Sequence, residues 1–137
     1  MADVPASPRD ALLIEAHRLI RDAATKAVEQ LGHASSNATV TYPPEPVLSN
    51  TETRALNALD VSQETRAALQ KVVANACATT LFNFLCLIDG VADPELVPVE
   101  DWFGLDLVEP SDDADRAMLH DDFYEFYWRY KDLTGAA

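Results

Sequence analysis

The feature that most constrains this sequence is a run of seventeen residues, Val72 to Ile88, that contains no charged side chain. Apolar residues occupy nearly every side of this run when it is drawn as a helix, a pattern typical of the centre of a bundle. The run is short and polar for a membrane span, which needs about 20 mostly apolar residues. Ser62 precedes the run and Gly90 follows it, and both are common cap residues at helix ends. The sequence therefore predicts a long, buried helix at residues 63–89.

Three other helices are predicted from similar signals at their ends. The first begins at Pro8 and ends at Gly32, because proline suits the first turn of a helix and glycine suits the position after its last turn. Serine caps predict the starts of a short second helix and of a last helix, which has several aspartates in its first turn. The expected helices, including the central one, are 8–31, 50–59, 63–89 and 112–133.

These elements predict an all-α fold, a bundle of about four helices. At 137 residues, the chain is long enough to form a single domain with a hydrophobic core. We therefore expect one helical domain over residues 1–137, with a flexible N-terminus at 1–6.

Proline-rich stretches connect the predicted helices. Prolines at positions 43, 44 and 46 exclude a helix there, so residues 33–48 are expected to form an extended strap over the bundle. A second stretch, 91–110, is predicted to be irregular with a short extended piece. The strap is expected to cover three uncharged polar side chains that lie four residues apart on the central helix: Asn75, Thr79 and Asn83.

The charge of the chain is strongly negative and unevenly distributed. The sequence has 23 acidic and 10 basic residues, for a net charge of −13. This balance argues against binding to nucleic acid or to an anionic membrane, because both require clustered Lys and Arg. Residues 1–88 carry a net charge of only −2, whereas residues 89–137 carry −11. The acidity therefore belongs to the last third of the chain.

The same third holds most of the aromatic residues, eight of the eleven lying between Trp102 and Tyr130. Carboxylates among aromatic side chains favour a docking surface for a basic partner protein, with electrostatic steering followed by burial of Trp102 or Trp128. The alternative is a solvated acidic face that only keeps the protein soluble. The expected partner contacts are Glu100, Asp101, Trp102, Asp106, Glu109, Asp112, Asp113, Asp115, Asp121, Asp122, Tyr124 and Trp128.

Catalytic patterns are weak in this sequence. His120 is followed by Asp121 and Asp122, but no pair of residues has the spacing of metal ligands on a helix, and no glycine-rich phosphate loop is present. We therefore expect no catalytic residue, no metal and no cofactor, and the sequence favours a protein that is not an enzyme. The alternative is a small helical enzyme or ligand-binding protein that uses His120 with neighbouring carboxylates, or the stripe of Asn75, Thr79 and Asn83.

In size and charge, the chain resembles the small acidic immunity and antitoxin proteins of bacteria, which neutralise a toxin enzyme by covering its active site. This resemblance implies a basic partner, such as a toxin enzyme. The N-terminus does not read as a secretory signal, and Cys77 and Cys86 are too far apart on one helix to form a disulfide with each other, so we expect a cytoplasmic protein. Self-association through the aromatic helix is a further possibility.

Overall fold

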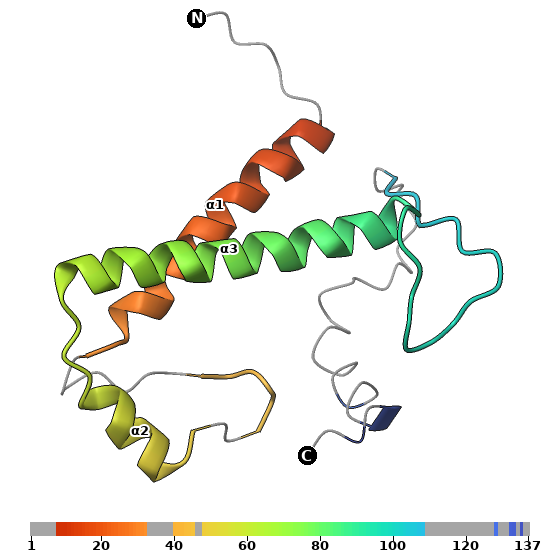
Figure 1. Cartoon of the computed structure of the whole chain (residues 1–137). Helices are drawn as coiled ribbons and strands as arrows, with labels where there is room; N and C mark the ends of the chain where they lie inside the picture. The colour runs from red at the N-terminus through yellow and green to blue at the C-terminus, as the bar shows by residue number, and fades with distance from the viewer. Residues whose placement is uncertain are drawn as a thin grey trace, which may run out of the picture. The chain divides into compact units, whose positions relative to one another are not determined.

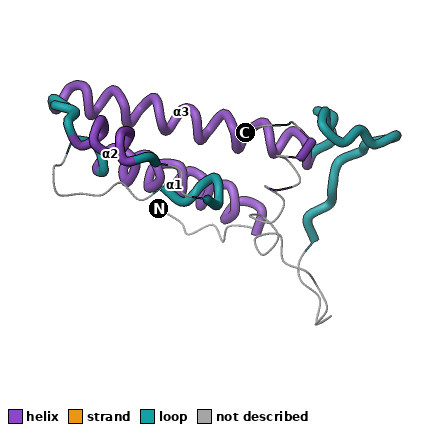
Figure 2. The backbone as a smooth tube through the Cα atoms, turned by 90° about the horizontal axis from the view of Figure 1, so that it is seen from below, coloured by secondary structure: helices purple, strands orange, loops and turns teal. Residues whose placement is uncertain are grey.

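The computed structural model describes residues 8–32, 40–45 and 48–108, together with Trp128, Asp132, Leu133 and Gly135. It contains three α-helices within these residues and no strand, so the fold is all-α (Figures 1 and 2). The helices are α1 (Pro8–Glu29), α2 (Asn50–Asn57) and α3 (Gln63–Ile88). The three helices expected in this part of the chain are confirmed, with ends one or two residues shorter than predicted.

Each long helix has the predicted end signals. Pro8 is the first residue of α1. At the start of α3, the Ser62 hydroxyl accepts a hydrogen bond from the Thr65 backbone N–H at 3.1 Å, which satisfies one of the amides that have no partner within the helix. Gly32 and Gly90 follow α1 and α3 with positive φ angles of 75° and 72°, which glycine adopts without steric cost.

The chain divides into two compact units. The first consists of residues 1–39 and 50–84, and it contains α1, α2 and most of α3. In this unit the C-terminal part of α1 lies beside the N-terminal part of α3, so the two helices run antiparallel (Figures 1 and 2). The described residues with buried side chains, Ala24 and Val28, both come from α1.

Side-chain hydrogen bonds hold α1 to α3. The Arg66 guanidinium donates to the backbone carbonyls of Val28 at 2.7 Å and Leu31 at 3.1 Å, and therefore caps the C-terminal end of α1. One turn further along α3, the Gln70 amide donates to the Thr25 hydroxyl at 3.0 Å. These contacts fix the alignment of the two helices.

The second unit consists of residues 40–49 and 85–137. Residues 40–45 form neither helix nor strand, as expected for the proline-rich strap, and the Tyr42–Pro43 peptide bond is cis. The predicted helix 112–133 lies outside the described residues except for Trp128, Asp132 and Leu133, so the four-helix bundle stays a prediction. The single domain stays a prediction too, and the predicted flexible residues 1–6 also lie outside the described part.

Two expectations about α3 are wrong. The helix was expected to be buried at the centre of a bundle, but none of its side chains is buried. The strap was expected to cover Asn75, Thr79 and Asn83, but all three are exposed. The reason is that, within the described residues of the first unit, one long helix packs along one side of α3. An apolar helix with one long neighbour keeps its other sides exposed.

Candidate functional site

The acidic segment begins where α3 ends, and the end of the helix fixes its direction. The Gly90 N–H donates to the Leu87 carbonyl at 3.1 Å, and the Val91 N–H donates to the Cys86 carbonyl at 3.0 Å. This pair of bonds is the Schellman motif, in which glycine adopts a left-handed conformation and the chain turns away from the helix. From residue 91 onward, the motif therefore directs the chain away from the axis of α3.

The segment then returns to the same helix end. The Trp102 indole N–H donates to the Leu87 carbonyl at 3.0 Å, and the Leu105 N–H donates to the Ile88 carbonyl at 2.8 Å. Both acceptors are among the last four carbonyls of α3, which have no partner within the helix. Residues 91–104 therefore form a loop whose two ends are both attached to the end of α3.

Two glycines allow this close approach. A Cβ atom on Gly104 would lie 2.2 Å from the Ile88 carbonyl oxygen, and one on Gly90 would lie 2.4 Å from the Phe103 carbonyl oxygen. Both glycines have positive φ angles. Any side chain at either position would therefore force the two backbones apart.

The surface of residues 91–108 combines exposed carboxylates with exposed apolar side chains. The carboxylates are Asp93, Glu95, Glu100, Asp101 and Asp106, all exposed, and no basic residue occurs between positions 89 and 108. Eight large apolar side chains are at least half exposed, and Phe103 has the largest exposed fraction at 84%. The others are Val91, Leu96, Val97, Val99, Leu105, Leu107 and Val108. We call residues 91–108 the acidic loop segment.

Four of the predicted partner contacts lie in the acidic loop segment. Glu100, Asp101 and Asp106 are exposed, whereas Trp102 is half-buried, with its indole hydrogen-bonded to the helix. Trp128 is 39% exposed. The remaining predicted contacts lie outside the described residues: Glu109, Asp112, Asp113, Asp115, Asp121, Asp122 and Tyr124.

The sequence-based contact set did not include Phe103. Its neighbour Gly104 gave the available signal, because an isolated glycine outside a helix can mark a close approach of two backbone segments. The signal could not be interpreted without knowing that the chain returns to α3 at that point.

The residues of the alternative catalytic hypothesis are not brought together in the described part of the chain. His120 and its neighbouring aspartates lie outside it. Within the described residues, no group of three His, Cys, Asp or Glu side chains could hold a metal ion. Asn75, Thr79 and Asn83 lie on an exposed helix face.

The clearest electrostatic cluster lies on α1. Arg18 forms ion pairs with Glu15 and Asp22, one turn before and after it. Its hydrogen bond to Glu15 lowers the pKa of that carboxyl and raises the pKa of the Arg18 guanidinium. All three groups are at the surface, so the cluster supports the helix and forms no enclosed site.

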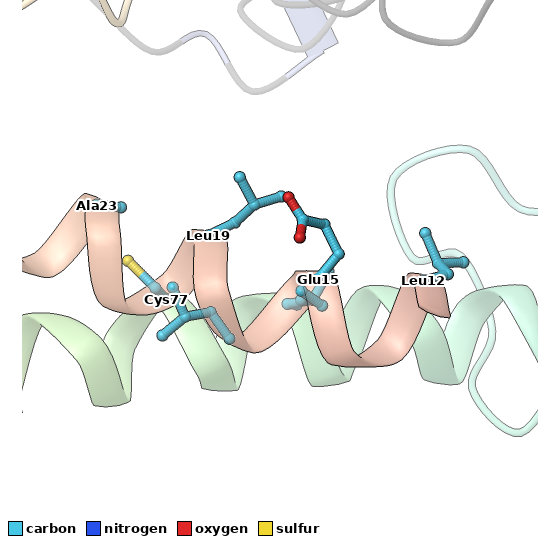
Figure 3. A pocket seen from close by; sticks show the side chains of 8 residues that line it. Leu12, Glu15, Leu19, Ala23 and Cys77 are labelled. Carbon is cyan, nitrogen blue, oxygen red and sulfur yellow. The ribbon is translucent and has the colours of Figure 1, made fainter. Parts of the chain in front are cut away.

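An open apolar hollow of about 370 Å³ lies along α1 and α3 (Figure 3). Glu15 is its one charged lining residue, and this carboxylate is already paired with Arg18. Small-ligand sites usually combine an apolar lining with several converging polar groups, which this hollow lacks. Its lining residues are Leu12, Glu15, Ala16, Leu19, Ile20, Ala23, Cys77 and Leu81.

Comparison with known proteins gives no relative: no protein-family model, no curated protein and no solved structure matches the chain significantly. Within the described residues, α3 is long and apolar enough, by length and composition, to cross a membrane. A core helix of a soluble protein has the same properties, so this finding does not assign a location.

Proposed function

We propose that this protein is a non-enzymatic interaction protein that binds a basic surface of a partner protein through the acidic loop segment. The observation that carries the proposal is the surface of residues 91–108, where five exposed carboxylates alternate with eight large, exposed apolar side chains and no basic residue is present. Exposed apolar side chains that gather among polar groups are typical of a surface that contacts another protein. The carboxylates define that partner as basic.

Binding proceeds in two stages. The carboxylates steer a basic protein toward the loop, because complementary charge accelerates encounter. Phe103 then becomes buried in the partner, since an exposed aromatic side chain supplies the large apolar contact found at interface hot spots. Trp102 contributes indirectly, because its hydrogen bond to Leu87 holds the loop in place.

The attachment of the loop supports this role. A loop that is already ordered loses less conformational entropy on binding than a free one does. Here the Gly90 and Trp102 contacts hold both ends of the loop at α3. An inhibitor of the immunity or antitoxin type, which covers the active site of a basic toxin enzyme, would use such a preformed acidic surface.

The test is affinity capture from an extract of the source cell, with captured proteins identified by mass spectrometry. The variant combines Glu100→Gln, Asp101→Asn and Asp106→Asn. Asparagine tolerates the positive φ of 55° at position 101, so the fold is retained. The control removes the same number of carboxylates elsewhere: Asp10→Asn, Glu29→Gln and Glu64→Gln.

We expect wild type and control to capture the same basic protein, and the loop variant to associate with it about tenfold more slowly at low salt. Phe103→Ala should accelerate dissociation without changing the salt dependence. If the loop variant bound the captured protein with an unchanged rate and salt dependence, the proposal would be wrong.

A further inference from the structure

The side of α3 that faces away from α1 has an unusual composition. At about 100° per residue, this outer face lies about 120° to 180° from Cys77, which lines the hollow beside α1. Val72 and Phe82 on this face are 63% and 66% exposed. We define the outer face as the exposed residues Val72, Asn75, Thr79, Phe82 and Asn83.

A helix face that contacts water normally carries charged side chains. The outer face carries none, and the whole stretch from Val72 to Ile88 is uncharged. In a chain with a net charge of −13, two copies meet with little repulsion on this uncharged surface. The face therefore has the electrostatic character of a contact surface.

The polar residues of the outer face are placed symmetrically about Thr79. Asn75 lies four residues before it and Asn83 four residues after it. If two copies of α3 paired antiparallel with a two-fold axis at Thr79, Asn75 of each copy would face Asn83 of the other. Carboxamides both donate and accept hydrogen bonds, so the two side chains can pair in both directions. A two-fold interface requires this kind of self-complementarity.

The charges at the ends of the uncharged stretch select the antiparallel orientation. Lys71 precedes the stretch and Asp89 follows it, and both are exposed. An antiparallel pair brings Lys71 of each copy toward Asp89 of the other, whereas a parallel pair would place like charges together.

A lipid bilayer fits the outer face less well than a second copy does. The uncharged stretch spans about 26 Å as a helix, whereas the hydrocarbon core of a bilayer is about 30 Å thick. Asn75, Thr79 and Asn83 would also bring their polar groups into that core. In the dimer, the same three groups have partners.

We infer that the protein forms an antiparallel homodimer through the outer face of α3, with the two-fold axis at Thr79. The outer face and the acidic loop segment consist of different residues, so this inference does not rest on the proposed function. A single helix pair is a small interface, so the dimer dissociates on dilution.

The test is sedimentation equilibrium of the full chain over a wide concentration range. Thr79→Lys places two cations face to face on the axis, and we expect this variant to stay monomeric at concentrations where the wild type is dimeric. Thr80→Lys is the matched control, because it makes the same change at the next position, which is exposed but off the outer face. The control should dimerise like the wild type, and circular dichroism should show equal helix content in all three proteins.

Charge reversal tests the orientation. Lys71→Glu and Asp89→Lys should each weaken the dimer about fivefold, and the double variant should restore wild-type affinity. In a parallel dimer, residue 71 faces residue 71 and residue 89 faces residue 89. A single charge reversal would then replace one pair of like charges with another and leave the affinity unaltered.

The inference would be overturned by a wild type that is monomeric at every concentration, or by equal dimerisation of the Thr79 and Thr80 variants. Flotation of the wild type with neutral phosphatidylcholine vesicles, abolished by Thr79→Lys, would overturn it in favour of a lipid contact.

Discussion

At its N-terminal end α3 is held by side chains, whereas at its C-terminal end it is held mainly by backbone. Arg66 and Gln70 reach from the helix to α1, a segment more than thirty residues earlier in the chain. At the other end, the amides of Gly90, Val91 and Leu105 and the Trp102 indole satisfy the last carbonyls. The first arrangement joins two helices, and the second attaches a loop.

The two ends also differ in the surfaces that they support. The α1–α3 pair, in the nearly neutral front of the chain, leaves an uncharged helix face exposed. The C-terminal end of α3 presents apolar side chains among carboxylates. An uncharged self-complementary face suits a second copy, whereas an acidic face suits a basic partner. Two surfaces with similar apolar exposure therefore fit different partners, because the charge around the apolar side chains differs.

The largest effect should come from breaking the backbone attachment. Gly104→Ala places a Cβ atom against the Ile88 carbonyl oxygen at a positive φ, and we expect it to cost about 3 kcal/mol of local stability. Amide hydrogen exchange at Leu105 measures the loss, because its N–H is bonded to that carbonyl.

The control for this change is Gly135→Ala. Gly135 also has a positive φ, of 60°, but a Cβ atom there would have no neighbour within 4 Å. Gly135→Ala should lower local stability by about 1 kcal/mol, because only the backbone conformation is unfavourable for alanine there. Equal exchange at Leu105 in the two variants would show that the backbone crossing does not hold the loop.

A smaller effect is expected from breaking the side-chain attachment. Arg66→Met removes the guanidinium that caps α1 but keeps much of the aliphatic stem, and should lower the free energy of unfolding by about 2 kcal/mol. Urea denaturation followed by circular dichroism measures it.

Arg54→Met is the matched control for Arg66→Met. The Arg54 side chain donates to the Asn50 carbonyl of its own short helix at an exposed position, so its loss should cost about 0.5 kcal/mol. If both variants lost the same stability, the contact between α1 and α3 would not depend on the cap.

The smallest effect concerns acid stability. Because Arg18 lowers the pKa of Glu15, this carboxylate stabilises the fold above its pKa in the unfolded chain, and the contribution is lost as the pH falls through its folded pKa. Glu15→Gln should therefore reduce the dependence of unfolding free energy on pH in the acid range. Denaturation at neutral and acid pH compares the two proteins, and an unchanged pH slope would show that the pair contributes nothing.

The helices could be predicted from the sequence because their signals are local. Pro8, Ser62 and Gly90 each act within one helical turn, and the predicted ends fall within two residues of those observed. The surroundings of α3 could not be predicted in the same way. Apolar side chains on all sides of a helix predict that its surface is covered, but they do not show which element covers it, or whether any element of the same chain does.

The candidate site was predicted in composition but not in geometry. The acidic residues Glu100, Asp101 and Asp106 were identified from charge, and they are exposed. The half-burial of Trp102 was not foreseen, because its acceptor is the backbone carbonyl of Leu87, and a carbonyl has no signature in the sequence. Long-range contacts to backbone are invisible to pattern analysis, as the Arg66 cap also shows.

The contact between Gly90 and Gly104 has a consequence for how the sequence of this protein can vary. The chain leaves α3 at one glycine and comes back to it at the other, so the residues between them can be exchanged as an insert, provided that Trp102 or an equivalent contact to Leu87 is kept. Because the entropy of closing a loop rises by only about 0.6 kcal/mol for each doubling of its length, inserts of different size and sequence could occupy this position. Recognition could then be altered by exchanging the insert, while the helices that carry it keep their sequence.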